Sequence, residues 1–442
     1  MTVVTRFAPS PTGRLHVGNI RAALHNWMFA RSQSGRFLLR IDDTDAERSE
    51  ERFVAAIRDD LAWLGLQPDQ SVRQSERFGL YEKRFDELRA AGRIYPAYET
   101  SQELDLKRKI QLGRGLPPVY DRAALQLTDA DRNRLEQDGV RPHWRFRLDH
   151  DAPVEWDDLV RGHQRFDPRT MSDPVIRRAD GSWLYMLPSA IDDMDLGISH
   201  VVRGEDHVAN TALQIQMFAA LGNAPPSFAH TALLTGSEGK LSKRLGSLGV
   251  DQLREAGIEP QAIRALLARL GTSDPVEPVG DMIPLLATFD FGRFGRAPAR
   301  FDEAELAQLS ARIVHQLPYS TVADRLPAGM TADAWDAVKP NLTTVAEAAD
   351  WWRVIEGPVD ATIPDEDRAF LVEAADAAQA ITWEGDPWHQ LVGVLKERTG
   401  RKGKALFLPL RLALTGRDHG PDMAALLPLI GRDRAISRLQ SA

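Results

Sequence analysis

The stretch FAPSPTGRLHVGN, from Phe7 to Asn19, places two prolines and a glycine between an apolar run and the first turn of a helix. Val3 to Ala8 is rich in residues that favour β structure, and the segment after Gly18 carries apolar residues at helical spacing. Phe37 to Ile41 (FLLRI) follows as a second strand. A strand, a helix and a strand within about forty residues predict a βαβ unit with parallel strands and a right-handed crossover.

Ligands of such sheets bind beyond the carboxyl ends of the strands. Several polar residues close or follow the two predicted strands, and this rule places them on one rim of the sheet: Arg6, Ser10, His16, Asp42, Asp43 and Asp45. The opening stretch therefore predicts a ligand site as well as a fold.

The composition bounds the class of protein. A chain of 442 residues has room for about three domains. It has no cysteine, which excludes disulfides and thiolate metal sites, and no apolar run as long as a membrane span. The N-terminus MTVVTRFAPS lacks the layout of a secretion signal, so we expect a cytoplasmic protein. The net charge of −8 argues against a protein that coats nucleic acid indiscriminately, although local basic patches remain compatible with it.

The periodicity changes several times along the chain. We expect a helix from Ser49 to Gly65, whereas residues 95–188 combine charged helical pieces with short strand-like runs and form an insertion between two halves of a sheet. The strand pattern resumes at Ile198 to Val202, and a helix follows from Asn210. Beyond Phe301 the apolar residues recur mostly at helical spacing, which predicts an all-helical C-terminal part.

The motif HVGN, His16 to Asn19, lies at the expected N-terminus of a helix. Free backbone N–H groups and the positive end of the helix dipole favour an anion there, and phosphate is the natural guest. The alternative is that Pro11 and Gly13 only shape a turn, with His16 capping the helix or lying on the surface.

The basic run KLSKR, Lys240 to Arg244, lies between Gly239 and Gly246. A charge run of this size is by itself most simply a solvated loop. The flanking glycines favour a second interpretation, in which a loop brings Lys240 and Lys243 to a polyphosphate as negative charge moves onto its leaving part.

Arg6 and Arg203 close two different predicted strands. Since a guanidinium binds carboxylates through two parallel hydrogen bonds, two arginines on the ligand rim indicate a substrate with carboxylate groups. The alternative is that each forms a structural ion pair with a neighbour such as Glu205 or Asp42.

The acidic run IDDTD follows the second strand. We favour Asp42 as the residue that binds a substrate ammonium, and we expect Asp43 and Asp45 to be loop and helix-cap residues.

Five ordered motifs, FAPSPTGRLHVGN, FLLRIDDTD, RQSERF, VVRGEDH and KLSKR, closely resemble those of the bacterial glutamyl-tRNA synthetases, which are class I aminoacyl-tRNA synthetases. HVGN resembles the class signature HIGH, and KLSKR resembles KMSKS. The similarity extends through KGKALFLPLRLALTG near the C-terminus. It implies an α/β fold, in which a Rossmann-type parallel-sheet catalytic domain carries an α+β acceptor-binding insertion and is followed by an all-helical anticodon-binding domain.

The resemblance also implies domain boundaries. We expect residues 1–94 and 189–235 to form the two halves of the catalytic domain, and residues 95–188 to form the insertion that binds the acceptor stem. Residues 236–305 would form a stem-contact region with the KLSKR loop, and residues 306–442 the anticodon-binding domain.

The activity implied is that of a glutamate–tRNA ligase, which uses ATP with Mg²⁺ to form glutamyl-adenylate and then acylates the terminal 2′-hydroxyl of tRNA(Glu). By this resemblance the ATP-binding residues are Pro11, Gly13, His16, Gly18, Asn19, Lys240, Ser242 and Lys243, and the catalytic residues among them are His16, Lys240 and Lys243. The residues implied to bind glutamate are Arg6, Ser10, Asp42, Tyr185 and Arg203, with Arg203 on the side-chain carboxylate. A glutamine side chain would leave that guanidinium poorly paired, so we expect rejection by charge and hydrogen bonding rather than by size.

The sequence departs from the family pattern in three ways. The usual IEDTD reads IDDTD, so that Asp42 is one methylene shorter than the family residue, and Ser189 stands where relatives often carry asparagine. Zinc-bearing relatives have cysteines around YPAYET, where this chain has Ala97 and Glu99. We therefore expect no zinc and no other metal site built by the protein alone.

The run KERTGRKGK, Lys396 to Lys404, is a basic patch suited to the backbone phosphates of a nucleic acid. The alternative is that the same run is a solvated loop. The residues expected to bind tRNA are Arg401, Lys402, Lys404 and Asn341. Some discriminating relatives carry an arginine near the position of Asn341 that disfavours the glutamine anticodon. Its absence here raises the hypothesis that the enzyme also charges tRNA(Gln). We expect a monomer that does not bind membranes.

Three other functions are alternatives to this one. Glutaminyl-tRNA synthetases share the catalytic core but end in β-barrels, in contrast to the helical periodicity of this C-terminal third. A small-molecule nucleotidylyltransferase of the same superfamily would not need the insertion or the helical C-terminal part, so their presence argues against this function. A non-catalytic RNA-binding paralogue is disfavoured because His16, Lys240 and Lys243 are all present.

Overall fold

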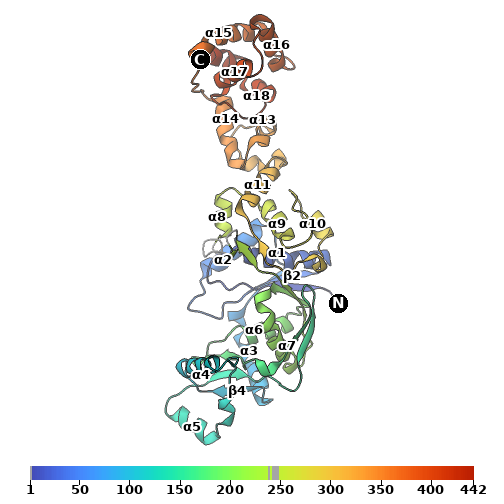
Figure 1. Cartoon of the computed structure of the whole chain (residues 1–442), viewed down its shortest axis with the longest axis vertical. Helices are drawn as coiled ribbons and strands as arrows, with labels where there is room; N and C mark the ends of the chain where they lie inside the picture. Colours follow the sequence, from blue (N-terminus) through green and yellow to red (C-terminus); the bar gives the residue numbers. More distant parts are fainter. Residues whose placement is uncertain (1, 237–238, 241–247) are drawn as a thin grey trace. The chain divides into compact units, whose positions relative to one another are not determined.

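The computed structural model describes residues 2–236, 239–240 and 248–442. The chain divides into two compact units (Figure 1). The first comprises Met1–Leu253, Arg264–Glu277 and Asp281–Asp302, and the second comprises Arg254–Ile263, Pro278–Gly280 and Glu303–Ala442. Each unit is described separately below.

The opening βαβ unit forms as predicted. β1 (Val4–Phe7) pairs in parallel with β2 (Arg36–Ile41), which in turn pairs in parallel with β3 (Gln70–Arg73). α1 (Val17–Ser32) connects the first two strands and packs on both. All residues of β1 and all but the first of β2 are buried, as expected for a parallel sheet that is covered on both faces.

A second pair of parallel strands, β9 (His200–Gly204) and β10 (Ser227–Thr231), adjoins the first three. β9 contacts β1, and the N–H group of Ser199 donates a hydrogen bond of 2.9 Å to the Val4 carbonyl. α7 (Val208–Ala220) connects β9 to β10 and packs against α6 (Met186–Asp195). The strand predicted at Ile198 to Val202 and the helix predicted from Asn210 are therefore confirmed, and β9 lies beside β1 of the N-terminal sheet.

Two further helices, α2 (Glu51–Trp63) and α3 (Phe78–Ala90), complete the N-terminal half. α2 begins close to the predicted Ser49 and stops before Gly65, whose φ of +69° is left-handed and strains residues other than glycine. The core of this unit is built by apolar side chains from both halves and from the segment between them, including Leu38, Tyr81, Phe85, Phe146, Leu187, Ile191 and Phe228.

The segment between the two halves is α+β, as expected. β4 (Ile94–Ala97), β5 (His143–Phe146) and β8 (Val175–Arg177) form an antiparallel sheet, and β6 (Val154–Asp158) and β7 (Gly162–Phe166) form a hairpin. The helices are α4 (Ser101–Gly113) and α5 (Asp129–Gln137). β6 contacts β10, and the Leu159 N–H donates to the Phe228 carbonyl at 2.9 Å. This hairpin therefore packs on the strands of the central sheet.

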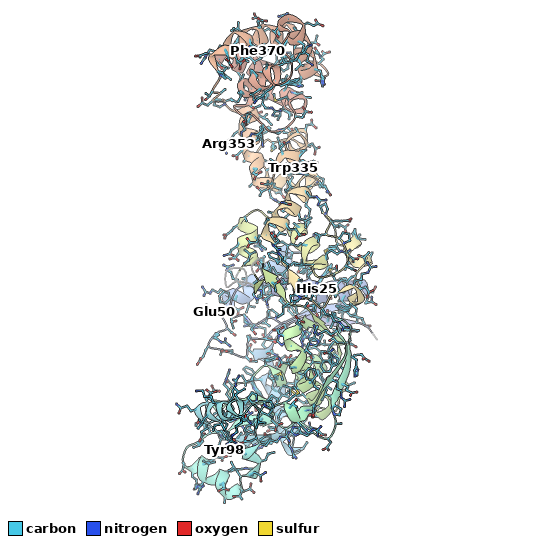
Figure 2. All side chains as sticks on the ribbon, viewed as in Figure 1. His25, Glu50, Tyr98, Trp335, Arg353 and Phe370 are labelled. Atoms are coloured by element: carbon cyan, nitrogen blue, oxygen red, sulfur yellow. The ribbon has the colours of Figure 1, made fainter. Side chains whose placement is uncertain are left out.

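After β10 the chain forms β11 (Leu234–Gly236) and β12 (Gly239–Lys240), an antiparallel pair, and β13 (Ala299–Arg300) joins β11 in parallel. The helices that follow β12 are α8 (Val250–Glu255), α9 (Pro260–Arg269) and α10 (Ile283–Ala287). α10 packs on α1. Phe289, Phe291 and Phe294 gather beside Phe29 and the buried ring of His25, which Figure 2 labels.

The second unit is built from helices, in agreement with the 3.6-residue periodicity. They are α11 (Glu303–Val314), α12 (Tyr319–Val322), α13 (Ala332–Val338), α14 (Ala348–Glu356), α15 (Asp365–Ala380), α16 (Pro387–Thr399), α17 (Lys404–Thr415), α18 (Met423–Ile430) and α19 (Arg432–Ser441). α15 packs on α16, α17 and α19, and Trp335 of α13 is buried with its indole N–H bonded to the Leu317 carbonyl at 2.9 Å (Figure 2).

Short 3₁₀ helices occur in both units: η1 (Gln74–Arg77), η2 (Ala123–Gln126), η3 (Pro168–Thr170), η4 (Glu205–His207), η5 (Phe291–Arg293), η6 (Ala323–Arg325), η7 (Lys339–Asn341) and η8 (Val345–Glu347). Among the residues that the structure describes, no helix has both the length and the apolar character needed to cross a membrane.

Candidate active site

His16 is the N-cap residue of α1, in extended backbone conformation. Its Nδ1 accepts a hydrogen bond from the Gly18 N–H at 3.1 Å, and its own N–H donates to Oδ1 of Asn19 at 3.2 Å. The structure therefore confirms the alternative in which His16 caps the helix. It does not exclude the anion-binding role, because a neutral ring that accepts at Nδ1 carries its proton on Nε2 and still has a donor to offer. Burial lowers the pKa of His16, which favours this neutral form.

Gly18 is required by the position of that ring. A Cβ atom on Gly18 would lie 3.0 Å from Cε1 and 3.1 Å from Nδ1 of His16, closer than ordinary van der Waals contact. In contrast, a Cβ on Gly13 would meet no atom within 4 Å, and Pro11 is buried, with its carbonyl accepting from the Glu50 N–H at 3.1 Å. In the loop before α1, Pro11 is therefore held by burial and a hydrogen bond, whereas space for a side chain remains beside Gly13.

Residues 249 and 250, which follow the second signature in the sequence, contact the first signature along the backbone. His16 forms an antiparallel bridge with Gly249, and the Val250 N–H donates to the Leu15 carbonyl at 3.2 Å. Lys240 lies in β12 opposite Thr235, while Ser242 and Lys243 lie outside the described residues. The described segment that begins at residue 248 thus lies against the N-terminus of α1.

Arg6 and Arg40 form a buried network with two aspartates. Nε of Arg6 and Nη1 of Arg40 bind the same oxygen of Asp193, at 3.1 Å and 2.7 Å. Arg40 also binds both oxygens of Asp42, at 2.7 Å and 3.0 Å, and its Nη2 donates to Oγ of Ser189 at 2.9 Å. Arg6 is therefore paired with Asp193 rather than with Asp42.

This network bears directly on the predicted ammonium site. Asp42 follows β2 at the carboxyl-end rim, and burial raises the pKa of its carboxyl group while the Arg40 guanidinium opposes that rise. Both Asp42 oxygens already bind Arg40, so an ammonium ligand would share them with a guanidinium. Ser189, the other departure from the family pattern, contacts the same guanidinium.

The next two acids of IDDTD are loop residues, and the expectation of a cap was wrong. Asp43 accepts from Arg73 and from the backbone and hydroxyl of Ser75, which ties it to the RQSERF motif. Asp45 accepts from Arg48 within its own turn. The N-cap of α2 is Glu50, which makes no side-chain capping bond, because the chain extends beyond Asp45 before the helix begins.

Arg203 is buried, and its hydrogen-bond partners among the described residues are neutral side chains. Its Nε donates to Nε2 of His230 at 3.3 Å and its Nη2 to Oγ1 of Thr211 at 2.5 Å, and no acidic side chain within the described ranges forms an ion pair with it. Glu205, the neighbour expected as an alternative partner, binds Arg161 at 2.5 Å instead. Burial, together with repulsion from the Arg6 guanidinium, lowers the pKa of Arg203 to about 10. A carboxylate ligand would relieve both effects.

Tyr185 and Ser10 complete the set of residues predicted to bind glutamate. The Tyr185 hydroxyl accepts from Nδ2 of Asn210 at 2.5 Å, and its side chain remains 37% exposed. Burial raises the pKa of this phenol, and the nearby Arg203 and Arg6 partly offset the rise. Ser10 is exposed in the loop after β1, next to Pro9, whose carbonyl accepts from the Asp42 N–H at 3.0 Å. The rim of β1, β2 and β9 therefore collects the predicted residues.

His230, Thr211 and Asp158 contact this site without having been predicted. His230 lies opposite Arg203 in the register of β9 and β10, and its Nδ1 is 2.5 Å from Oδ2 of Asp158. A histidine within an apolar strand is the one signal in the sequence that could have indicated it. Asp158 offered none, because it lies in the segment expected to be an insertion.

The residues predicted to bind tRNA lie in the second unit. Lys402 and Lys404 are exposed, and so is Asn341 at the end of η7. Arg401 is engaged within the unit, since it pairs with Asp367 at 2.5 Å and lies 4.4 Å from the ring centre of Phe370, which Figure 2 labels.

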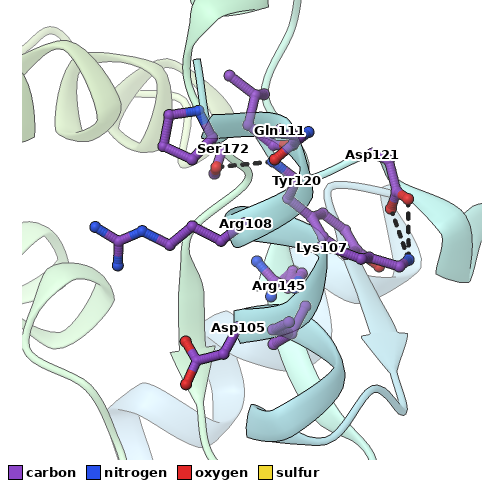
Figure 3. Close-up of a pocket in the computed structure, with 11 residues that line it drawn as sticks. Asp105, Lys107, Arg108, Gln111, Tyr120, Asp121, Arg145 and Ser172 are labelled. Atoms are coloured by element: carbon purple, nitrogen blue, oxygen red, sulfur yellow. Dashed lines mark hydrogen bonds and ion pairs between the residues drawn. The ribbon is translucent and has the colours of Figure 1, made fainter. Parts of the chain in front are cut away.

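A pocket of about 230 Å³ lies away from the sheet rim, between α4 and residues 118–121 (Figure 3). Lys107 binds Asp121 across it at 2.9 Å, and the buried Arg145 lies 3.8 Å from the ring centre of Tyr120. Lys107 and Asp121 are the charged lining residues that pair with each other, and the pocket includes none of the residues predicted to bind substrates. Nearby, Ala97 is buried in β4 and Glu99 accepts from the Tyr120 hydroxyl at 2.7 Å. Within the described ranges, no three histidine or acidic side chains are grouped to hold a metal ion.

Comparisons with known proteins agree with this architecture. Residues 2–306 match the family described as tRNA synthetases class I (E and Q), catalytic domain, and residues 304–442 match the anticodon binding domain family. The chain is 68% identical over 440 residues to glutamate–tRNA ligase 1 of Rhizorhabdus wittichii, covering 100% of this chain and 99% of that protein. It is 61% identical over 443 residues to glutamate–tRNA ligase 1 of Zymomonas mobilis, with 100% and 99% covered.

Among solved structures, a crystal structure of a glutamate tRNA ligase from Elizabethkingia meningosepticum in complex with its amino acid matches with a TM-score of 0.86 at 26% identity, covering 100% of this chain and 99% of that one. Matches of this extent in sequence and structure, together with a sheet rim that carries both signature flanks and an unneutralised buried arginine, show that the chain belongs to the glutamate–tRNA ligases, which are class I aminoacyl-tRNA synthetases.

Proposed function

We propose that the enzyme joins L-glutamate to tRNA(Glu) in two steps on the rim of β1, β2 and β9. The α-carboxylate of glutamate first attacks the α-phosphorus of ATP, which forms glutamyl-adenylate and releases pyrophosphate. The 2′-hydroxyl of the terminal adenosine of the tRNA then takes the glutamyl group, and AMP leaves. The observation that carries this proposal is the buried Arg203, whose charge has no carboxylate partner among the described residues.

Arg203 would bind the side-chain carboxylate of glutamate. Two of its nitrogens, Nε and Nη2, are held by neutral acceptors, so the charge is available to a ligand and Nη1 is free to donate. Glutamine would present an uncharged amide, leaving the buried cation poorly paired at a cost far above that of a lost contact in water. Selection against glutamine would therefore arise at this residue.

Arg6, Ser10, Asp42 and Tyr185 would bind the remainder of the amino acid. Arg6 lies in β1, Ser10 and Asp42 follow β1 and β2, and Tyr185 precedes α6. The electrostatic effect of Arg6 and Tyr185 on Arg203 supports a common site. Asp42 would accept from the ammonium only by sharing its oxygens with Arg40, which makes its contribution weaker than that of a longer, free carboxylate.

ATP would bind at the tip of α1. Nε2–H of His16 is a donor suited to a phosphate oxygen, and Gly18 keeps the surface beside it open. Pro11, Gly13 and Asn19 would shape the same loop, and Lys240, Ser242 and Lys243 would approach from the second signature. Mg²⁺ bound with ATP would neutralise part of the phosphate charge, and we expect no zinc.

The tRNA would span both units. The α+β segment between the sheet halves would hold the acceptor stem, and the helical unit would hold the anticodon, with the exposed Lys402 and Lys404 on backbone phosphates and Asn341 near the anticodon. Such an enzyme acts in the cytoplasm, where tRNA is charged, and we expect it to act as a monomer.

The replacement of Arg203 by lysine tests the proposal. Lysine keeps the positive charge but loses the planar fork, so we expect the KM for glutamate in tRNA charging to rise at least tenfold while the KM for ATP changes little. The change Arg165→Lys, at an exposed arginine of β7, serves as the control. An unchanged KM for glutamate in Arg203→Lys would remove Arg203 from the glutamate site.

A further inference from the structure

The buried side chains of His230, Asp158 and Thr211 form a hydrogen-bonded group beside the Arg203 guanidinium. Nε of Arg203 donates to Nε2 of His230 at 3.3 Å, and Nδ1 of His230 donates to Oδ2 of Asp158 at 2.5 Å. Thr211 closes the group, since its Oγ1 accepts from Nη2 of Arg203 at 2.5 Å and lies 2.9 Å from Nε2 of His230. The side chains of His230 and Asp158 are fully buried.

The hydrogen bonds around Asp158 determine the tautomer of His230. Oδ1 of Asp158 accepts three backbone N–H groups, those of Val160 at 3.1 Å, Arg161 at 2.9 Å and His230 at 3.1 Å. Oδ2 is thereby left for the imidazole, whose Nδ1 must donate to it. The lone pair of Nε2 then faces the Nε–H donor of Arg203 and the hydroxyl of Thr211, whose proton can go to Nε2 or to the His207 carbonyl.

The neutral acceptor on Arg203 is the His230 imidazole, and its effect on the guanidinium differs from that of a carboxylate. An acid placed directly on Arg203 would orient the guanidinium but would also neutralise it. The imidazole orients the guanidinium and leaves its charge in place, while the charge of Asp158 lies one residue further away and is shared among four donors. Burial lowers the pKa of His230, which keeps the ring neutral.

We propose that His230 and Asp158 are positioning residues that set the enzyme's selectivity for a substrate carboxylate, because they hold the Arg203 guanidinium in place without neutralising it. This inference rests on the proposed function of Arg203. It adds a structural basis for selectivity that extends into the hairpin of β6 and β7, outside the strands that carry Arg203 itself.

The variant Asp158→Asn tests the inference. The three backbone N–H groups require the amide oxygen at Oδ1, so the amide nitrogen must occupy the place of Oδ2 and donate to Nδ1 of His230. The ring would then carry its proton on Nε2, where it would point at the Nε–H donor of Arg203. We expect the KM for glutamate to rise about tenfold or more, with the KM for ATP within about twofold of the wild-type value.

The tautomer can be read independently of activity. In protein labelled with ¹⁵N-histidine, the imidazole signals that disappear in His230→Gln belong to His230. They should report Nδ1–H in the wild type and Nε2–H in Asp158→Asn. Asp157→Asn, at an exposed neighbour in the same strand, should change neither the signals nor the KM for glutamate.

A second pair of variants guards against misfolding of Asp158→Asn. Glutamine at position 230 can place an amide oxygen near the former Nε2, whereas leucine cannot accept a hydrogen bond. His230→Gln should therefore retain a lower KM for glutamate than His230→Leu by about tenfold. Equal KM values in these two variants would contradict the inference, and so would a reversed tautomer in Asp158→Asn with an unchanged KM.

The Arg203→Lys variant distinguishes the two levels of failure. If it raises the KM for glutamate while Asp158→Asn does not, the positioning role is wrong and the proposed glutamate site stands. If Arg203→Lys has no effect either, the assignment of Arg203 to the glutamate carboxylate is itself wrong.

Discussion

The Gly18 amide donates its hydrogen bond to Nδ1 of His16, at 3.1 Å, so that one imidazole caps α1 and is oriented by the helix that it caps. The two interpretations of the HVGN motif, a helix cap and a phosphate ligand, therefore concern two different nitrogens of the same ring. Nδ1 accepts the capping hydrogen bond, and Nε2 is left as a donor.

The change His16→Asn separates these two roles. Asparagine is among the best N-cap residues, so the variant should keep the cap and a melting temperature close to that of the wild type. It has no donor at the position of Nε2–H, and we expect adenylate formation to slow by about 10²–10³-fold, the usual effect of losing one preorganised donor. Single-turnover formation of glutamyl-adenylate in the presence of tRNA measures this. If a stably folded His16→Asn variant forms adenylate at the wild-type rate, His16 caps the helix and does not contribute as a donor to ATP.

Gly18→Ala tests the spacing within the same motif. Alanine in a helix normally stabilises by about 0.5–1 kcal/mol relative to glycine, but here its Cβ would lie 3.0 Å from the His16 ring and displace it. We expect little change in stability and a rise of about tenfold in the KM for ATP, measured by initial rates of charging. Gly79→Ala is the matched control, because Gly79 is also the second residue of a helix and a Cβ there meets no atom within 4 Å. Equal effects of the two changes would show that the His16 ring does not matter.

The parts of the structure that could be predicted from sequence are those that depend on local spacing. The start of α1 follows from a histidine and a glycine after a proline-shaped loop, and the helical C-terminal unit follows from the 3.6-residue periodicity. The rim that gathers Arg6, Asp42 and Arg203 follows from a general rule for parallel sheets. None of these inferences requires knowledge of which distant side chains meet.

The contacts between charged side chains could not be predicted in this way. Arg6 was expected to pair, if at all, with Asp42 or Glu205, but it binds Asp193 of α6. Arg203 was given Glu205 as an alternative partner, but Glu205 binds Arg161, and a histidine from the next strand binds Arg203. Such partners depend on the order of strands and the packing of helices on them, which residue type and spacing do not encode.

The basic patch of the helical unit yields a prediction that distinguishes its members. Arg401 binds Asp367 and lies over the Phe370 ring, so Arg401→Ala should destabilise the unit by about 1–2 kcal/mol. Lys402→Ala and Lys404→Ala remove exposed side chains and should leave stability within about 0.5 kcal/mol. Each lysine change should instead weaken tRNA binding and reduce the slope of log affinity against log salt by about 1. Thermal unfolding and filter binding at several salt concentrations measure the two effects. An unchanged salt slope in both lysine variants would exclude this patch from the tRNA interface.

The choice of tRNA is the remaining prediction, and it centres on Asn341. This residue is exposed at the end of η7, so an arginine there can extend away from the buried Leu342 beside it. We expect the wild-type enzyme to acylate purified tRNA(Gln) as well as tRNA(Glu) with glutamate, and we expect Asn341→Arg to lower the charging of tRNA(Gln) about tenfold while leaving that of tRNA(Glu) within about twofold. Asn341→Lys is the control for charge alone, because lysine lacks the planar donor fork of arginine. Side-by-side charging of the two purified tRNAs measures these ratios. A wild-type enzyme that charges only tRNA(Glu) would rule out relaxed selection, and the discrimination would then have to reside in residues other than Asn341.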